Sequence, residues 1–263
     1  MGFKSRVLRK EVWSKKDYYL AARCGSSETS HPAMKRLSRL AGQVSSILDM
    51  GCGEGTRLNL LAKRAQKAVG IDISRKAIEL AKKKYPKLDF RQGDLEELPF
   101  RNESFELVYC AFVFEHLESP ETALKEGIRV LRKGGSLLIV APNFGAPNRA
   151  SPPFKGNRII KLIRGFVLDF FPKSGLNWNK VEPIATSEKY EIDWDTTIEP
   201  YLGSLIKFLQ DRGLLIEYFS SCWREELLSA SFIQKFFRFL GSRFIYPFYL
   251  WGPHLLVEVR KEG

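Results

Sequence analysis

ILDMGCGEGT, at residues 47–56, runs from a short apolar segment through three glycines into the start of a helical pattern. Such a segment is typical of a buried β-strand that turns sharply into a helix. A Cβ at the turn would collide with anything lying against it, so the glycines also let a ligand approach the backbone. We therefore predict a loop in which Gly51, Cys52, Gly53 and Gly55 contact a ligand. A turn whose glycines serve structure alone is the alternative.

The segments around this loop repeat the change from strand to helix. Apolar runs rich in Val, Ile and Leu predict strands at Ser46–Met50, Ala68–Ile73, Asp89–Gln92, Phe105–Ala111 and Ser136–Ala141. Helices are expected to open near Thr56, after an N-cap at Ser74, and at Ser119-Pro120-Glu121, the last stopping at Lys133-Gly134-Gly135. This alternation predicts an α/β fold with a mostly parallel sheet built from right-handed crossovers.

Two acidic residues follow the glycine loop at the ends of neighbouring strands. Asp72 ends the second strand, where its carboxylate can accept both ribose hydroxyls of an adenosine. Asp94 ends the third strand and can accept from an adenine amino group. The glycine spacing is G-x-G-x-G rather than G-x-G-x-x-G, which argues against a pyrophosphate cofactor and a nucleotide-binding dehydrogenase.

These residues resemble a known family. Together with Leu98-Pro99-Phe100, Phe105-Glu106-Leu107-Val108 and Leu131-Arg132-Lys133-Gly134-Gly135, they are similar to the motifs of class I S-adenosylmethionine-dependent methyltransferases of the small-molecule, type 11 and quinone-pathway kind. The resemblance covers residues 43–142. It implies a Rossmann-like, seven-stranded sheet with an antiparallel last strand, and S-adenosyl-L-methionine as the cofactor.

The resemblance also implies a place for each cofactor-binding residue. Asp49, Gly51 and Gly53 would lie along the methionine portion, with Cys52 and Gly55 in the same loop. Asp72 and Ile73 would hold the ribose and adenine, Asp94 and Leu95 would bracket the adenine, and Ala111 and Phe112 would line the sulfonium side.

A candidate catalytic pair follows the fourth strand. A hydroxyl acceptor must lose its proton during methyl transfer, and Glu115 and His116 are the best-placed candidate bases. The alternative is that both residues line the cofactor pocket or cap a turn. Some quinone-pathway O-methyltransferases carry Glu-x-x-Glu-His here as a metal site. Phe112 stands at the first acidic position, so no metal is expected.

Two insertions interrupt the pattern after residue 142. Residues 143–196 precede an expected helix at Ile198–Gln210 and strand at Leu214–Ser220, and residues 222–253 precede a last strand at His254–Arg260. We therefore divide the chain into an N-terminal helical cap (1–42), the cofactor-binding core (43–142), a lid or substrate insertion (143–196) and the rest of the core (197–263). Ligands bind at the carboxyl ends of parallel strands, so the first insertion is expected to cover a substrate.

Both insertions contain apolar helical segments. IIKLIRGFVLDFF, at residues 159–171, is almost continuously apolar. In residues 231–244, Ser231, Gln234, Lys235, Arg238 and Ser242 share one stripe, opposite Phe232, Ile233, Phe236, Phe237, Leu240 and Phe244. A basic, Phe-rich amphipathic helix is typical of a membrane interface. The alternative is a lid in which both segments pack on each other around a satellite core.

The whole chain sets further bounds. A formal net charge of +12 over 263 residues favours anionic partners such as phosphates or lipid surfaces. Four separated cysteines, and the lack of a signal peptide or a long apolar run, predict a cytoplasmic protein with reduced thiols. Trp13–Tyr19 resembles a short N-terminal helix that closes over the cofactor in related enzymes. These features do not fix an oligomeric state.

The leading interpretation is methyl transfer to an oxygen, or less readily a carbon or nitrogen, of a small or lipid-linked acceptor, with an anionic membrane surface as a further partner. An RNA methyltransferase is the first alternative because of the charge and the aromatic residues, but no RNA-binding module is recognisable and nucleic acid is not the expected partner. The remaining alternatives are a nucleotide-binding dehydrogenase and a protein that binds the cofactor without catalysing a reaction.

Overall fold

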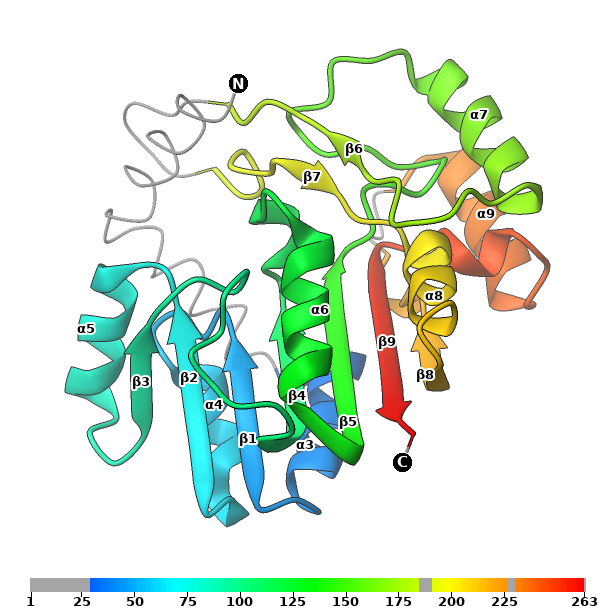
Figure 1. The fold of residues 1–263 in the computed structure, drawn as a ribbon. Helices are drawn as coiled ribbons and strands as arrows, with labels where there is room; N and C mark the ends of the chain where they lie inside the picture. The colour runs from blue at the N-terminus through cyan, green and yellow to red at the C-terminus, as the bar shows by residue number, and fades with distance from the viewer. Residues whose placement is uncertain (1–28, 185–190, 227–229, 263) are drawn as a thin grey trace.

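Seven strands form one mixed sheet at the centre of the molecule (Figure 1). The computed structural model describes residues 29–184, 191–226 and 230–262. The strands stand in the order β3-β2-β1-β4-β5-β9-β8. Their bounds are β1 Ser46–Met50, β2 Lys67–Asp72, β3 Asp89–Gln92, β4 Phe105–Ala111, β5 Leu131–Pro142, β8 Leu214–Ser220 and β9 His254–Lys261. Neighbours from β3 to β5 are parallel, and β9 runs antiparallel to β5 and β8. The expected fold class is confirmed.

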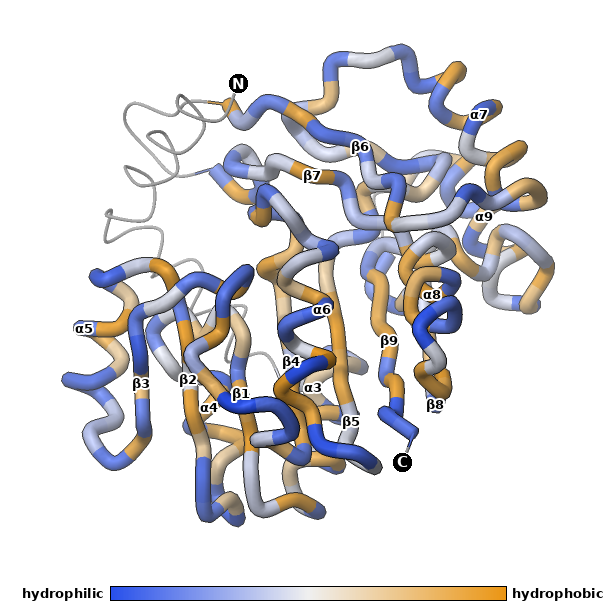
Figure 2. Tube along the Cα trace, in the orientation of Figure 1, coloured by the Kyte–Doolittle hydropathy of each residue, from blue (hydrophilic) through white to orange (hydrophobic). Residues whose placement is uncertain are grey.

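Helices cover both faces of this sheet. The helices α6 (Pro120–Val130) and α8 (Leu202–Gln210) pack on one face, and α3 (Pro32–Ala41), α4 (Thr56–Leu61) and α5 (Arg75–Lys84) pack on the other. Central strand β1 is buried along its whole length, with Leu48 in one core and Ile47 in the other. Successive side chains of a strand point to opposite faces, so a doubly covered strand is mostly apolar, and the buried Asp49 is an exception in β1. Figure 2 shows these hydrophobic central strands.

Several element ends differ from the expected ones. Strand β2 ends at Asp72, so Ile73 lies just beyond it. Helix α6 ends at Val130, and the segment Lys133-Gly134-Gly135 belongs to β5, which begins at Leu131 because Leu131 pairs with Phe105 before a register shift. The Ser74 hydroxyl accepts from the Ala77 amide and caps α5. Ser119 occupies the N-cap of α6 without a side-chain capping bond.

The expected helix at Ile198–Gln210 is wrong in its first turn. Ile198–Glu199 form strand β7, which pairs antiparallel with β6 (Asn179–Lys180), and α8 begins only at Leu202. Pro200 stands between the two elements, where it disfavours a continuous helix because it lacks an amide donor. The β6–β7 pair was not predicted, since each strand has two residues and pairs across a long separation in sequence.

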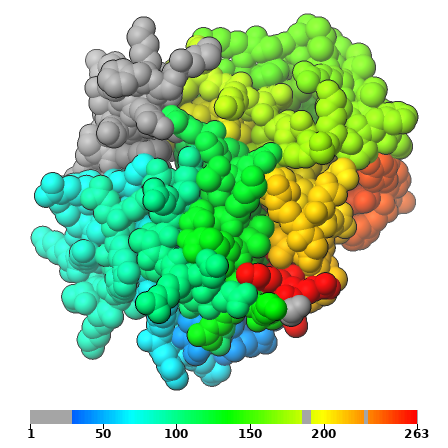
Figure 3. Space-filling view, in the orientation of Figure 1, coloured from blue at the N-terminus to red at the C-terminus, as the bar shows by residue number. Residues whose placement is uncertain are grey.

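The two insertions occupy different places. The part of the first insertion with β6 and β7 lies over the end of β4, where the Thr197 amide donates to the Glu115 carbonyl at 2.8 Å (Figure 1). Helices α7 (Arg158–Phe170) and α9 (Phe232–Ser242) lie instead beside each other at the β9 and β8 side of the sheet (Figures 1 and 3). No helix within the described ranges is long and apolar enough to cross a bilayer.

Candidate active site

The glycine loop joins β1 to α4 and is tied to two neighbouring strands. Gly51 has φ 85°, and the amides of Gly51 and Cys52 both donate to the Ile71 carbonyl of β2, at 2.8 and 3.0 Å. A Cβ on Gly51 would come within 2.3 Å of a Val113 methyl group, beyond the end of β4. Gly51 therefore permits both the left-handed turn and the close approach of the β4 end.

The other two glycines of the loop serve different purposes. Gly55, with φ 82°, N-caps α4, and a Cβ there would meet the Phe90 ring at 2.5 Å. Gly53 has φ 53°, and a Cβ on it would meet nothing within 4 Å among the described residues. Gly55 is thus required by packing, whereas the backbone at Gly53 borders open space into which a ligand can fit.

Substituting Gly51 separates its steric role from its torsional one. We expect Gly51→Ala to lower the free energy of unfolding by about 2–5 kcal/mol, combining about 1–2 kcal/mol for the left-handed torsion with about 1–3 kcal/mol for overpacking against Val113. Gly134→Ala is the matched control, because Gly134 has φ 74° and open space around it. In urea unfolding, Gly134→Ala should lose only the part of the free energy of unfolding that comes from the left-handed torsion. Equal losses in the two variants would contradict the Val113 contact.

Asp72 is held in the loop at the end of β2. Its Oδ2 accepts from the Gly53 amide at 2.9 Å, and its Oδ1 accepts from the Ser74 amide at 2.8 Å. Burial raises the pKa of the Asp72 carboxyl, while these two backbone bonds oppose the rise. The bonds fix the carboxylate beside Gly53, and its remaining lone pairs can accept from ligand hydroxyls.

The ends of β2 and β3 form an adjoining apolar and acidic surface. The Ile73 side chain is 48% exposed, which suits contact with a flat ring. Asp94 is exposed and accepts from the Glu96 amide at 2.9 Å. The Leu95 side chain lies in the hydrophobic core, so only its backbone is available to a ligand at this edge. The Gly93 amide donates to the Asp72 carbonyl at 3.0 Å and brings the two strand ends together.

Asp49 is a fully buried acid on β1, two residues before Gly51. Neither carboxylate oxygen has a hydrogen-bond partner among the described residues. Burial raises its pKa to about 7, against the lowering influence of the Arg57 charge and the Tyr109 hydroxyl. Arg57 itself donates to the Ala111 carbonyl at 3.2 Å, at the end of β4. Buried carboxylates are normally hydrogen-bonded, so Asp49 fits a site completed by a cationic or N–H group of a ligand.

The raised pKa of Asp49 makes stability depend on pH. In the unfolded chain the same carboxyl ionises near pH 4, so stabilisation present below pH 4 is lost as the pH rises to about 7. This group alone should lower the free energy of unfolding by up to about 1.4 kcal/mol per pH unit in that window. We expect Asp49→Asn to flatten the slope in urea unfolding between pH 5 and 7. Glu115 acts in the same direction, so a smaller slope should remain; an unchanged slope would refute the assignment.

His116 lies among three acids beyond the end of β4. Its Nδ1 is 3.5 Å from an Asp195 carboxylate oxygen, and its Nε2 is 3.7 Å from Glu115 Oε1. Burial lowers the pKa of His116, but Asp195, Glu115 and Asp193 together raise it above 6.5. Burial raises the pKa of Glu115 to about 7, which the His116 charge partly offsets. The predicted pair is therefore a buried cluster that can hold and release a proton near neutral pH.

The acids around His116 were missed in the sequence. Asp193 and Asp195 lie 77 and 79 positions after His116 and reach it only because the first insertion folds back over β4. Thr197 fixes the contact, since its hydroxyl donates to the Glu115 and Leu117 carbonyls at 3.2 Å each. The segment Asp193-Trp194-Asp195-Thr196-Thr197 has no recognised motif. Only its paired acids could have drawn attention to it.

Phe112, the residue that follows β4, packs against two histidine rings. It adopts φ 59°, and its ring meets His31 and His254 edge-on at 5.7 and 5.6 Å. Within the described ranges no three acidic, histidine or cysteine side chains are arranged to hold a metal ion. Cys52, Cys110 and Cys222 are buried free thiols. The Trp13–Tyr19 prediction and Cys24 lie outside the described residues.

A separate hollow lies at the opposite edge of the sheet. It has a volume of about 450 Å³ and is lined at the starts of β4 and β5 by Glu106, Arg132 and Lys133, with Arg260 from β9. Strands β1 and β2 end at the other edge, so this hollow is not part of the candidate site. The glycine loop, Asp72 and His116 gather where ligands bind in open α/β sheets.

Comparisons with known proteins agree with this geometry. A family model described as a methyltransferase domain matches residues 48–139. A protein of Mycolicibacterium smegmatis named probable S-adenosylmethionine-dependent methyltransferase is 36% identical over 116 residues, covering 43% of this chain and 44% of that protein. A demethylmenaquinone methyltransferase of Chlorobaculum parvum is 36% identical over 97 residues, covering 36% and 40%. The chain therefore spans less than half the length of these relatives.

Solved structures share the fold over most of the chain. An S-adenosylmethionine-dependent methyltransferase from Mesorhizobium loti aligns with a TM-score of 0.54 and 17% identity, covering 89% of this chain and all of that one. The strand order, the glycine loop after β1 and the matched family model agree with one another. Residues 48–139 match the methyltransferase-domain family, and the chain is similar to S-adenosylmethionine-dependent methyltransferases in sequence over part of its length and in fold over most of it.

Proposed function

We propose that the chain binds S-adenosyl-L-methionine at the glycine loop and transfers its methyl group to an oxygen of a lipid-like acceptor. One observation carries the cofactor assignment. Open space at Gly53 adjoins the Asp72 carboxylate, which two backbone amides hold in place. The partially exposed Ile73 and the unpaired buried Asp49 extend this site on either side.

Each portion of the cofactor has suitable residues. Asp72 would accept the ribose hydroxyls, Ile73 would contact the adenine face and Asp94 would accept its amino group. Asp49 lies beside the glycine loop and offers acceptors toward the methionine portion, directly or through water. When bound, the cofactor supplies a methyl group on a sulfonium, a strong electrophile that needs no protein nucleophile.

The protein's own chemical step is proton removal. Asp195 faces His116 Nδ1 and favours the tautomer with its proton on that nitrogen, leaving Nε2 to accept the acceptor's hydroxyl proton. The neighbouring Glu115 has a pKa of about 7 and can share the proton with Nε2 at neutral pH. The returning first insertion lies over this end of β4 and would exclude water from the cluster.

The acceptor class is inferred from the relatives and the surface. One curated relative is named for demethylmenaquinone, and a geranyl diphosphate methyltransferase shares the fold with a TM-score of 0.54 at 15% identity. Both names describe acceptors with apolar chains. Large apolar side chains of α7 are exposed, and α7 lies at the β9 side of the sheet, toward the edge at which the parallel strands end (Figure 1). We therefore place a quinone-type or other isoprenoid-like acceptor first.

RNA is the second candidate acceptor, favoured by the net charge of +12. A transfer assay with methyl-labelled cofactor distinguishes the two, using quinone-precursor extracts, total lipid and RNA in parallel. Label in the organic phase supports our assignment. Label that is removed by nuclease selects the RNA alternative, and no label in any fraction, with cofactor binding intact, rejects the acceptor proposal.

A further inference from the structure

Helix α7 buries two of its charged residues. Lys161 and Asp169, eight positions apart and so on one helix face, are both buried. The opposite face exposes large apolar side chains to solvent, including Ile159 at 68%, Ile163 at 61% and Phe170 at 50%. This arrangement reverses the usual amphipathic pattern of a helix in a globular protein.

The buried polar groups fix that orientation. Lys161 Nζ donates to Glu199 Oε2 at 2.6 Å and to the Phe144 carbonyl at 2.8 Å. Asp169 accepts from Trp251 Nε1 at 2.8 Å and from the Tyr201 hydroxyl. Turning α7 to bury its isoleucines would carry Lys161 away and leave the fully buried Glu199 carboxylate without its cation, which is strongly unfavourable. The apolar face is therefore held outward by the fold.

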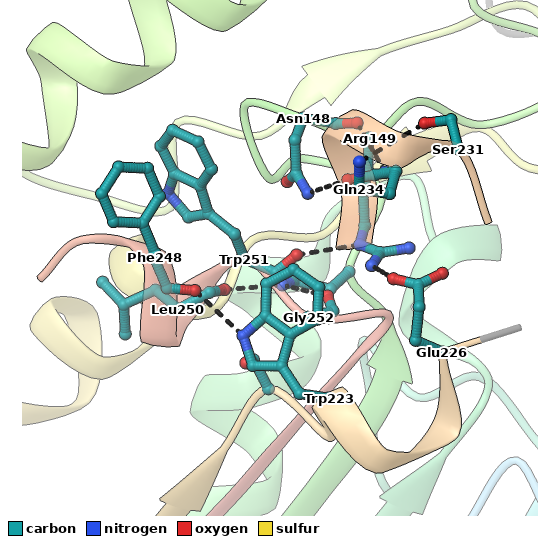
Figure 4. A network of polar contacts seen from close by, with 12 residues as sticks. Asn148, Arg149, Trp223, Glu226, Ser231, Gln234, Phe248, Leu250, Trp251 and Gly252 are labelled. Atoms are coloured by element: carbon teal, nitrogen blue, oxygen red, sulfur yellow. Dashed lines mark hydrogen bonds and ion pairs between the residues drawn. The ribbon is translucent and has the colours of Figure 1, made fainter. Parts of the chain in front are cut away.

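Helix α9 is fixed in a similar way. Gln234 Nε2 donates to the Asn148 carbonyl at 3.2 Å, and Asn148 Nδ2 donates to Gln234 Oε1 at 2.7 Å (Figure 4). Gly241 packs so closely on Trp223 that a Cβ would lie 2.1 Å from its indole nitrogen. The outer side then exposes Phe232 at 85%, Ile233 at 63% and Phe236 at 52%.

The two helices share one support. Phe166 of α7 and Phe237 of α9 both pack on Phe248 and Trp251, with ring centroids 5.3–6.4 Å apart. Trp251 belongs to the main hydrophobic core and Phe237 and Phe248 pack against that core, so these rings anchor both helices to it and are not a separate satellite core. The remaining apolar side chains of α7 and α9 lie outside these ring contacts, at the outer edge of the molecule (Figure 3). We call this outer surface the α7/α9 face.

Charge on the α7/α9 face is of one sign. Arg158 and Arg164 on α7 and Lys235 on α9 are exposed. Asp169 is the only acid in residues 154–181 and is buried, and residues 227–251 contain no acid. A second copy of the chain would bring these cations against each other, whereas an anionic lipid surface complements them.

We propose that the α7/α9 face docks on an anionic lipid bilayer, with its isoleucine and phenylalanine side chains inserted among the acyl chains and its lysine and arginine side chains at the headgroups. Such a surface holds the protein beside the layer in which apolar acceptors dissolve. The docking is independent of the methyl-transfer assignment, because it rests on α7 and α9 alone.

Vesicle flotation of the full chain tests the proposal. We expect flotation with vesicles of phosphatidylcholine and phosphatidylglycerol at low salt, loss at 0.5 M salt, and little flotation with phosphatidylcholine alone. Ile159→Glu and Phe232→Glu should each weaken partition about 10-fold or more. Lys235→Gln and Arg158→Gln should each weaken it about 5-fold.

Leu215→Glu is the matched control, since Leu215 is 48% exposed near the start of β8, where it pairs with Arg260 at the far end of β9, and is not part of the α7/α9 face. It should float like the unmodified chain. Failure of the intact chain to float with anionic vesicles at low salt would overturn the proposal. So would a dimer in sedimentation equilibrium that Ile159→Glu dissociates while flotation is unchanged, because the face would then be a contact between copies.

Discussion

Asp72→Ala should weaken binding of S-adenosylhomocysteine by about 100-fold or more. The carboxylate lies beside Gly53 with lone pairs available to two ribose hydroxyls, and each hydrogen bond to a charged acceptor contributes about 1.5–3 kcal/mol. Isothermal titration calorimetry measures the loss directly. The product is the right probe because it contains the same adenosine and no reactive methyl group.

Two controls keep the Asp72 result interpretable. Asp72 also accepts from the Gly53 and Ser74 amides, so thermal unfolding must show that the variant is folded. Asp94→Ala removes a carboxylate that is exposed to water. We expect this variant to bind S-adenosylhomocysteine at most about 10-fold more weakly. Folded Asp72→Ala protein that binds the product with unchanged affinity would show that the ribose lies elsewhere.

His116→Ala should lower kcat for a hydroxyl acceptor by about 100- to 10,000-fold while leaving the affinity for S-adenosylhomocysteine within a few-fold. The imidazole is the proton acceptor in the proposed step, and it is not assigned to cofactor binding. Single-turnover methyl transfer measures the first quantity and calorimetry the second. A loss of cofactor binding equal to the loss in rate would instead show that His116 lines the cofactor pocket.

The pH profile separates base catalysis from packing. His116 must be neutral to accept a proton, so the rate should rise as the pH passes through a pKa above 6.5. Asp195 raises that pKa, so Asp195→Asn should move the rising limb to lower pH while reducing the maximal rate through the loss of the preferred tautomer. An unshifted limb in Asp195→Asn would remove Asp195 from the mechanism.

Much of the fold could be predicted because its signals are local. Strands β1, β3, β4 and β8 have the predicted bounds, and the central strands β1 and β4 were recognisable because strands covered on both faces are mostly apolar. The glycine loop was recognisable because left-handed torsions and close contacts at Gly51 and Gly55 leave few other residues possible. The helix expected from Ile198 failed because a two-residue strand pairing replaced its first turn.

The candidate site divides in the same way. The cofactor side is built from segments adjacent to strand ends, so Asp72 could be proposed from its distance to the loop and Ile73 from the family resemblance. The surroundings of His116 could not be predicted, because Asp193 and Asp195 belong to the first insertion. That insertion folds back over β4 through contacts made by Thr197 and strand β7. Contacts between residues about 80 positions apart produce no periodic pattern in the sequence.

The amino-acid sequence by itself determined the central sheet, the loop at residues 47–56 and the resemblance to methyltransferases, because hydrophobic period, glycine spacing and strand-end acids are local properties. It also located two amphipathic segments. Only the tertiary structure decided which faces of α7 and α9 meet solvent. The buried partners of Lys161, Asp169 and Gln234 come from distant parts of the chain, and these contacts hold the apolar side outward.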